Sequence, residues 1–265
     1  MKRRSRREPI YHSKIVLAVY LVLRGLVILT GFRAAYRRDY ESMLLCVLTL
    51  VLLLLPSVLE KHLRIELPDT FEVIILVFIY AAEILGEINN FYIIVPHWDT
   101  MLHTFNGFGC AAIGFALVDM LNRSERFSIR LSPLYLALAA FCFSMTIGVC
   151  WEFFEYGMDT LFHKDMQKDT VLSELRSVTL DETRKNKVVQ ISDISDVIVV
   201  HSDGTEESLG VGGYLDVGLH DTMKDLLVNL VGAVVFSVIG FIYVRQRGKG
   251  RIAARFIPIV KTESE

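Results

Sequence analysis

Charged residues are scarce in this sequence. Of its 265 residues, only 22% are Asp, Glu, Lys or Arg, whereas 52% are hydrophobic, and the mean hydropathy is +0.43. A chain this apolar cannot bury its hydrophobic residues within an ordinary soluble domain. The formal net charge of -2 also provides no excess of positive charge for binding nucleic acid. The composition therefore indicates a polytopic membrane protein and argues against nucleic acid as a partner.

Cysteine is scarce as well, and its placement narrows the chemistry. All four cysteines fall in apolar segments, and none has the Cys-x-x-Cys spacing of a thiolate zinc site or the pattern of a disulfide framework. We expect them to be small apolar packing residues. They are Cys46, Cys110, Cys142 and Cys150.

Long hydrophobic runs are abundant, and six of them are long enough to cross a membrane. In lipid, a helix satisfies its own backbone hydrogen bonds, and runs of this length do not fit the short strands of a barrel. The predicted fold class is an all-α polytopic membrane protein: a six-helix transmembrane bundle with a small extracytoplasmic β-hairpin insertion. The predicted spans are residues 13–32, 43–59, 71–89, 97–121, 133–158 and 220–244.

Lysine and arginine predict the orientation of these spans. Their main clusters alternate along the chain so that, by the positive-inside rule, both termini lie in the cytoplasm. Arg33, Arg37 and Arg38 are the exception, because this orientation places them on the opposite side. The clusters that favour it fall in residues 1–14, 61–64, 123–130 and 245–261.

The long polar segment between the last two predicted spans predicts the insertion. Residues 187–192 and 196–201 are rich in β-branched side chains, and Asp203-Gly204 is a tight-turn signal. The insertion could act as a lid over a site, or it could be a tolerated decoration. We divide the chain into residues 1–162 with the first five spans, 163–219 as the extracytoplasmic insertion, and 220–265 with the last span and a basic cytoplasmic tail.

Polar residues recur at helical spacing in the last three predicted spans. Residues three or four apart share one face of a helix, so each cluster points in one direction. Ionisable groups within a span are costly and are read as functional. With the predicted orientation, the three clusters lie at a similar depth near the extracytoplasmic surface. They are Trp98-Asp99-x3-His103, Trp151-Glu152-x2-Glu155-x3-Asp159 and Asp221-x3-Asp225-x3-Asn229.

Carboxylates outnumber the basic residues Arg24 and Lys224 in this half of the predicted bundle. A bound divalent cation would balance them, and oxygen-rich ligands favour Mg or Mn while a histidine permits Zn. Protonated carboxylates or a hydrated cavity are the alternatives. The predicted metal ligands are Asp99, His103, Glu152, Glu155, Asp221 and Asp225.

Catalytic and ligand-binding roles are also predicted for residues near this cation. Glu152 and Glu155 are the candidate catalytic bases for a metal-activated water. The predicted ligand-binding residues are Arg24, Glu83, Lys224 and Asn229.

Structural roles compete with these functional ones. Arg24 can pair with Glu83 between helices, and Asn229 with Gly232-Ala233 fits close helix packing. Glu87 and Asp159 fit hydrated groups just outside the hydrocarbon, and Trp98 and Trp151 fit an interfacial aromatic belt.

The three clusters together resemble the motifs of the YjdF-like family of bacterial inner-membrane proteins. Their order is more loosely similar to the VanZ-like family, which is associated with glycopeptide resistance and the cell envelope. The similarity covers residues 97–160 and 214–242. It implies a bacterial plasma-membrane location and a shared polar site, and it implies no substrate.

The sequence thus predicts a multi-pass plasma-membrane protein of the cell envelope. We expect its extracytoplasmic acidic and histidine site to bind a divalent cation (Mg, Mn or Zn), a phosphate-bearing lipid-linked ligand, or both, with hydrolysis as the accompanying reaction. A proton- or cation-coupled transporter and a non-catalytic membrane assembly factor are the alternatives. The transporter would need polar residues through the cytoplasmic half, where these spans have few.

Overall fold

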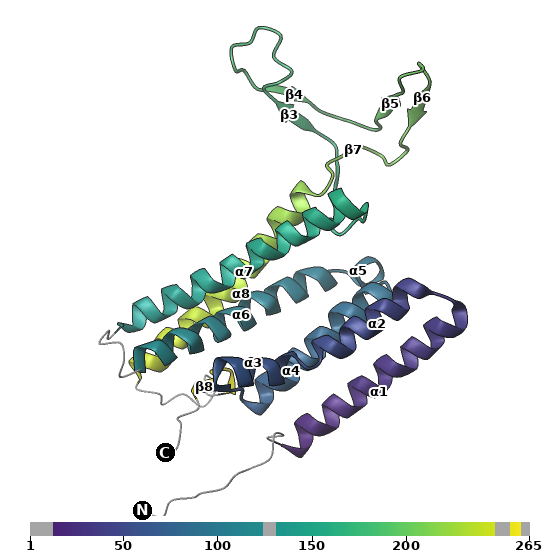
Figure 1. Cartoon of the computed structure of the whole chain (residues 1–265). Helices are drawn as coiled ribbons and strands as arrows, with labels where there is room; N and C mark the ends of the chain where they lie inside the picture. The colour runs from purple at the N-terminus through teal and green to yellow at the C-terminus, as the bar shows by residue number, and fades with distance from the viewer. Residues whose placement is uncertain (1–12, 124–130, 247–254, 261–265) are drawn as a thin grey trace, which may run out of the picture. The chain divides into compact units, whose positions relative to one another are not determined.

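The computed structural model describes residues 13–123, 131–246 and 255–260, and it consists mainly of helices (Figure 1). Much of the basic sequence on which the predicted orientation depends lies outside these residues. The helices are α1 (Lys14–Arg37), α2 (Tyr40–Leu52), α3 (Leu55–Leu63), α4 (Asp69–Tyr80), the π-helix η1 (Ala81–Ile88), α5 (Phe91–Ile94), α6 (Trp98–Arg123), α7 (Pro133–Phe162) and α8 (Leu219–Arg245). The strands are β1 (Ile65–Glu66), β2 (Val171–Leu172), β3 (Leu175–Ser177), β4 (Val189–Ile191), β5 (Ile198–Val200), β6 (Glu206–Ser208), β7 (Tyr214–Leu215) and β8 (Ile259–Val260).

Side-chain caps define where the first helices begin. The Ser13 hydroxyl accepts the backbone N–H of Val16 at 3.2 Å, and the Asp39 carboxylate accepts that of Ser42 at 3.1 Å. Each bond satisfies a donor that the first turn of a helix leaves without an intrahelical partner. Arg38 ends α1 in the left-handed conformation, with φ of 57°, where a glycine is more common. The short turn at Arg38 and Asp39 folds α2 back along α1 (Figure 1).

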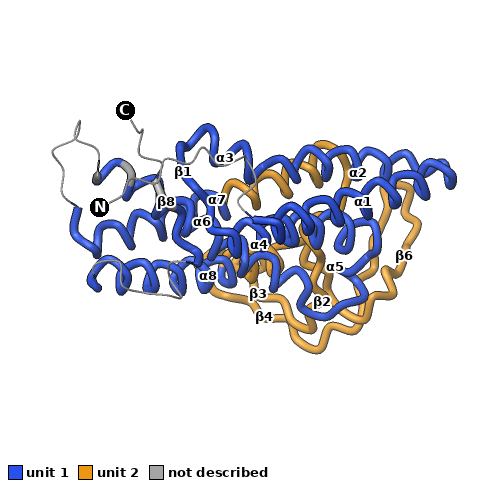
Figure 2. Tube along the Cα trace, turned by 90° about the horizontal axis from the view of Figure 1, so that it is seen from below, with its two compact units in different colours: residues 1–148, 227–265 blue, residues 149–226 orange. Residues whose placement is uncertain are grey.

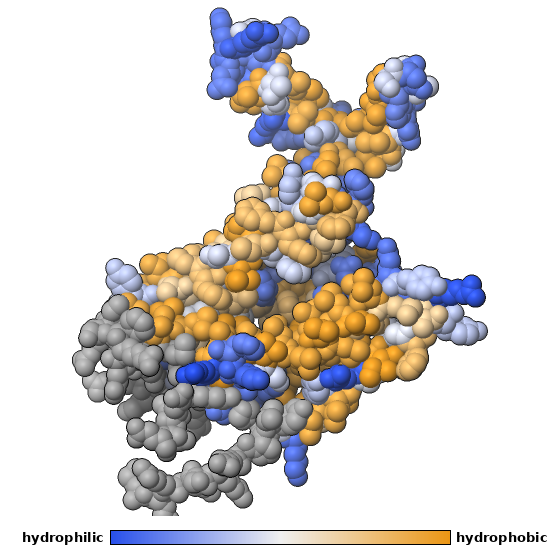
Figure 3. All heavy atoms as spheres, viewed as in Figure 1, coloured by the Kyte–Doolittle hydropathy of each residue, from blue (hydrophilic) through white to orange (hydrophobic). Residues whose placement is uncertain are grey.

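Within the described residues, five helical segments are long and apolar enough to cross a membrane. They correspond to five of the six predicted spans, and Figure 3 shows apolar side chains covering much of the helical surface. The remaining predicted span, residues 71–89, is helical as α4 followed by η1 but is not among the five. Its acidic residues Glu72, Glu83 and Glu87 interrupt the apolar sequence. A sixth crossing therefore stays a prediction. The five segments are residues 14–37, 40–63, 98–119, 133–162 and 219–245.

The segment between α7 and α8 contains the predicted hairpin. Strands β5 and β6 pair antiparallel, with Val200 opposite Glu206, and Gly204 adopts φ of 83° in the connecting turn. A positive φ is the conformation that a tight hairpin turn requires and that glycine adopts without strain. Two pairings were not predicted: β4 pairs with β3, and β2 pairs with β7. The insertion therefore has three short antiparallel pairs among its described residues.

The chain separates into two compact units (Figure 2). Unit 1 comprises residues 1–148 and 227–265, and unit 2 comprises residues 149–226. Unit 2 therefore holds the insertion together with the end of α7 and the start of α8. Both boundaries fall inside continuous helices, so the residues on either side of each boundary are joined by an uninterrupted helical backbone.

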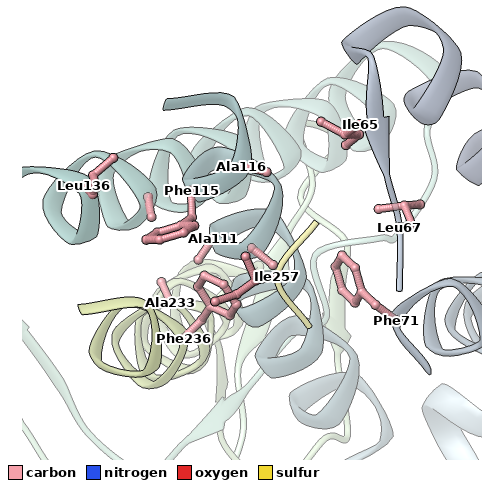
Figure 4. Close-up of a cluster of buried hydrophobic side chains, with 12 residues drawn as sticks. Ile65, Leu67, Phe71, Ala111, Phe115, Ala116, Leu136, Ala233, Phe236 and Ile257 are labelled. Carbon is pink, nitrogen blue, oxygen red and sulfur yellow. The ribbon is translucent and has the colours of Figure 1, made fainter. Parts of the chain in front are cut away.

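The main hydrophobic core of unit 1 joins α6, α7 and α8 to the α3–α4 connection (Figure 4). Phe115 and Phe236 pack edge to face with ring centroids 6.0 Å apart, and both side chains are fully buried. The end of the chain completes this core, because Ile257 is buried in it and β8 pairs antiparallel with β1. The parts of α6, α7 and α8 that belong to unit 1 are thus held together by tertiary packing.

Candidate metal centre at the start of α6 and α8

Helices α6 and α8 touch backbone to backbone through two glycines. A Cβ atom on Gly107 would lie 2.1 Å from the carbonyl oxygen of Asn229, and one on Gly232 would lie 2.0 Å from that of Thr104. Neither distance leaves room for a side chain, so only glycine permits this approach. The sequence-based alternative of close packing around Asn229 and Gly232-Ala233 is confirmed.

Helix α7 meets the same contact. A Cβ atom on Gly148 would lie 2.6 Å from the Asn229 side-chain nitrogen, and the Ser144 hydroxyl donates to the Gly107 carbonyl at 2.7 Å. Asn106 donates to the Asn229 side-chain oxygen at 3.3 Å. Asn229 is only 1% exposed, so its amide lies among the three helices. This polar contact fixes how α6, α7 and α8 cross.

One helical turn separates this crossing from three of the predicted site residues. His103 precedes Gly107 by four residues on α6, Asp225 precedes Asn229 by four on α8, and Glu152 follows Gly148 by four on α7. Because each helix is uninterrupted here, these side chains extend from the crossing in the direction in which α6 and α8 begin. All three are buried, with exposures of 8% for His103, 1% for Asp225 and 4% for Glu152.

Helices α6 and α8 bring three potential metal ligands together. His103 Nε2 lies 3.4 Å from an Asp99 carboxylate oxygen, one turn away on α6. One ligand atom each from Asp99, His103 and Asp225 lie within 4.8 Å of one another. Ligands at about 2.0–2.2 Å from one ion are at most about 4.4 Å apart, so this spacing is within a few tenths of an ångström of coordination. The cluster could hold a metal ion.

The second predicted base, Glu155, has an identified donor. The Trp151 indole N–H donates to its carboxylate at 2.8 Å, across one turn of α7. A neutral N–H donor stabilises the charged carboxylate and fixes its position. The roles of Glu152 and Glu155 as metal ligands or bases stay predictions.

Two of the acidic residues in the predicted clusters hold the insertion to its flanking helices. The Asp159 carboxylate accepts the backbone N–H groups of Met166 and Gln167 at 2.6 and 2.8 Å. The Asp221 carboxylate accepts that of Lys168 at 2.9 Å and lies 3.3 Å from the Lys224 ammonium. These contacts give both acids a structural task within unit 2. A metal-ligand role for Asp221 stays a prediction.

The basic residues of the predicted site have nearby partners. Lys224 Nζ lies 3.7 Å from an Asp225 carboxylate oxygen, so it offsets part of the negative charge there. The Arg24 guanidinium donates to the Tyr20 hydroxyl and lies 5.2 Å from the centre of that ring. Within the described residues, Arg24 makes no ion pair with Glu83, which lies in the π-helical turn η1. Their ligand-binding roles stay predictions.

Asp216 was missed by the sequence interpretation. Its carboxylate accepts backbone N–H groups of Thr170 at 2.9 Å and of His220 at 2.8 Å, and the His220 Nδ1 atom lies 2.5 Å away. Burial raises the pKa of Asp216, but these hydrogen bonds outweigh it, and the pKa is below its usual value. Asp216 lies four residues before the predicted span that starts at residue 220, whereas an N-cap residue directly precedes its helix, so the capping signal does not identify it.

Comparison with known proteins agrees with this architecture. The apolar helices and the buried polar centre define a multi-spanning membrane protein. The chain belongs to a family of predicted membrane proteins, DUF2238, whose family model matches residues 15–246. That match includes every residue of the candidate metal centre.

An uncharacterized protein of Thermotoga maritima is 26% identical to the chain over 106 residues. The aligned region is 40% of the chain and 53% of the relative, so the chain spans about half of that protein's length. No solved structure matches the chain.

Proposed function

We propose that this membrane protein binds a divalent cation through Asp99, His103 and Asp225, where α6 and α8 begin. The observation that carries the proposal is the approach of three ligand atoms to within 4.8 Å, one turn beyond a glycine-lined helix crossing. The crossing gives the two helices a defined separation.

Charge supports a cation at this position. Two carboxylates beside an imidazole in an apolar bundle carry a high electrostatic cost, and the Lys224 ammonium 3.7 Å from Asp225 lowers it. A divalent ion supplies two positive charges and accepts the lone pairs directly. Two oxygen donors and one nitrogen donor suit Mn or Zn, and Mg fits where water completes the coordination.

The proposed ligand of this cation is a phosphate-bearing, lipid-linked molecule of the bacterial cell envelope. A metal ion that keeps open coordination positions binds phosphate oxygens, and the start of a spanning helix lies at the level of lipid headgroups. Distribution of lysine and arginine supports an orientation with both termini in the cytoplasm and this site facing the other side. Glu152 is the proposed base for hydrolysis by a metal-bound water.

A purely structural role is the competing candidate, and one observation favours it. Asn106, Ser144 and Asn229 already link α6, α7 and α8 by hydrogen bonds. In an assembly factor, the outer acidic turn would extend this packing without binding an ion. The two candidates differ in whether the residues beyond the crossing bind metal.

Equilibrium dialysis of the detergent-purified protein against Mn, Zn and Mg separates the two. We expect the wild-type protein to retain close to one equivalent of one of these ions. Asp225→Asn and His103→Gln should each lower the affinity by at least about tenfold, which is about 1.4 kcal/mol. Asp119→Asn changes an acid near the far end of α6 and should bind like wild type. Equal, negligible binding by all four proteins would overturn the proposal and support the structural role.

A further inference from the structure

A groove lies between α6 and α8. Its volume is about 330 Å³, which is at the lower end of the range for ligand pockets. Six of its lining residues come from α6 and the residue before it, beginning at His97 and ending at Phe108, and two come from α8, Gly232 and Val235. Helical periodicity puts Met101 and Phe105 on the face of α6 opposite Asp99 and His103. The groove is therefore distinct from the candidate metal centre.

Apolar groups dominate the groove wall. The side chains of Met101, Phe105 and Val235 are all more than one-third exposed, and their helices are long and apolar enough to cross a membrane. The Thr104 hydroxyl donates to the Thr100 carbonyl at 2.7 Å, so its hydrogen-bonding need is met within α6. Such a wall offers little to water. In a bilayer its natural partner is hydrocarbon.

The groove has the length of one leaflet. From His97 to Phe108 the chain advances eleven residues, or about 16 Å at about 1.5 Å per residue. Half of a hydrocarbon core of about 30 Å is about 15 Å. In a bilayer that α6 enters at its first residue, a groove of this length reaches from the surface to about the centre. A straight chain lying along these apolar side chains could make van der Waals contacts with them over this length.

We propose that this groove binds one acyl chain of a phospholipid from the leaflet in which α6 begins. The proposal goes beyond the proposed function, because the occupant is a lipid of the surrounding bilayer, and it does not depend on the cation. Phospholipid is favoured over a rarer isoprenoid lipid because it surrounds these helices at very high concentration, and binding follows mass action. Shape, and not a polar contact, selects the chain.

Photo-crosslinking in nanodiscs tests the groove. The probe is a phosphatidylglycerol whose acyl chain carries a diazirine near its middle, and the labelled peptides are mapped by mass spectrometry. In the wild-type protein we expect labels to concentrate at residues 97–108 of α6 and residues 232–235 of α8. Labelling that is no denser there than on the exposed α1 residues Leu21 and Val22 would overturn the proposal, without requiring any variant.

Two neighbouring substitutions supply a matched comparison. Val235 lines the groove and Val234 does not, yet their exposures are similar at 47% and 41%. Val235→Trp should fill the groove and reduce its labelling severalfold, whereas Val234→Trp should label like wild type. Equal labelling of both variants would contradict the proposal. If an isoprenyl phosphate displaces the probe and phosphatidylglycerol does not, the groove binds an isoprenoid chain, and the phospholipid proposal is wrong.

Cation binding by the same proteins keeps the two sites distinguishable. Both tryptophan variants should retain the Mn or Zn affinity of wild type, because neither residue belongs to the metal centre. Loss of groove labelling in Val235→Trp, together with normal cation binding, supports an acyl-chain site that is separate from the metal centre. Normal groove labelling in a protein that binds no cation would leave the acyl-chain proposal standing and overturn only the metal centre.

Discussion

The contact between α6 and α8 predicts an unusually large effect for the substitution Gly107→Ala. The new Cβ atom would lie 2.1 Å from the carbonyl oxygen of Asn229, which is backbone and cannot rotate away. Either α8 moves as a body or α6 bends. Gly25→Ala is the matched control, because Gly25 lies within α1 and a Cβ there meets nothing within 4 Å.

The two substitutions should change the free energy of unfolding in opposite directions and by different amounts. Alanine favours a helix over glycine by up to about 1 kcal/mol, so Gly25→Ala should be neutral or stabilising. Overpacking typically costs about 1–3 kcal/mol, and at Gly107 it should exceed this gain. Because both variants share the helix-propensity gain, they should differ in stability by the overpacking cost, about 1–3 kcal/mol. At about 2–4 °C per kcal/mol for a chain of this size, their Tm values should differ by about 2–12 °C.

Thermal unfolding in detergent, followed by intrinsic fluorescence, measures this difference. Because α8 carries Asp225, a shift of α8 should also weaken Mn binding by Gly107→Ala, whereas Gly25→Ala should bind normally. A Gly107→Ala protein as stable as Gly25→Ala, with unchanged Mn affinity, would refute the glycine-mediated crossing and its link to the metal centre.

Three further predictions concern other contacts. Ser144→Ala removes the hydrogen bond to the Gly107 carbonyl and should cost about 0.5–1.5 kcal/mol, seen as a lower Tm, whereas an unchanged Tm would contradict a native bond there. Ile257→Ala leaves a cavity in the core and should cost about 2–5 kcal/mol, while a change below about 1 kcal/mol would mean that the C-terminal segment does not dock. The lowered pKa of Asp216 means that its stabilising effect is complete above the ordinary value of 3.8 and is lost as pH falls through the lower folded value. Pepsin should therefore cleave residues 163–219 faster as the pH falls from 4 toward about 2, and Asp216→Asn should flatten this dependence.

Hydrophobic runs in the sequence predict the helices well, because a span must be both long and apolar. Residues 69–88 are helical but are not among the five apolar segments, because Glu72, Glu83 and Glu87 interrupt the apolar run. Over residues 81–88 the helix is the π-helix η1. The π-helical geometry has no simple sequence signal. Gly86 lies within η1, where a Cβ atom would be 2.4 Å from the Tyr92 ring.

Whether the sequence predicts a strand pairing depends on how far apart the two strands lie in the chain. The Asp203-Gly204 turn predicts the β5–β6 hairpin because that pairing is local. Strands β1 and β8 have two residues each, too few for an alternating pattern, and they lie far apart in the sequence, at residues 65–66 and 259–260. No local signal therefore predicts their pairing.

For the candidate site, too, the sequence predicts contacts within one helix but not contacts between helices. Helical spacing correctly places Asp99 and His103 one turn apart on α6, but it cannot indicate that Gly107, Gly148 and Asn229 meet. That contact depends on three helices at once. Asp159 and Asp221 share the spacing of the predicted ligands, yet they bind backbone N–H groups of the insertion, because the chain returns to them after α7.

Electron spin echo envelope modulation of Mn-loaded protein tests the metal centre most directly, because it detects a ¹⁴N nucleus bound to the metal. With His103 and two carboxylates as ligands, the wild-type protein should show coupling to one imidazole nitrogen. His103→Gln should lose that coupling, and His62→Gln, a change at an exposed histidine on α3, should keep it. A wild-type spectrum without nitrogen coupling, or one that persists in His103→Gln, would contradict a cation held by Asp99, His103 and Asp225.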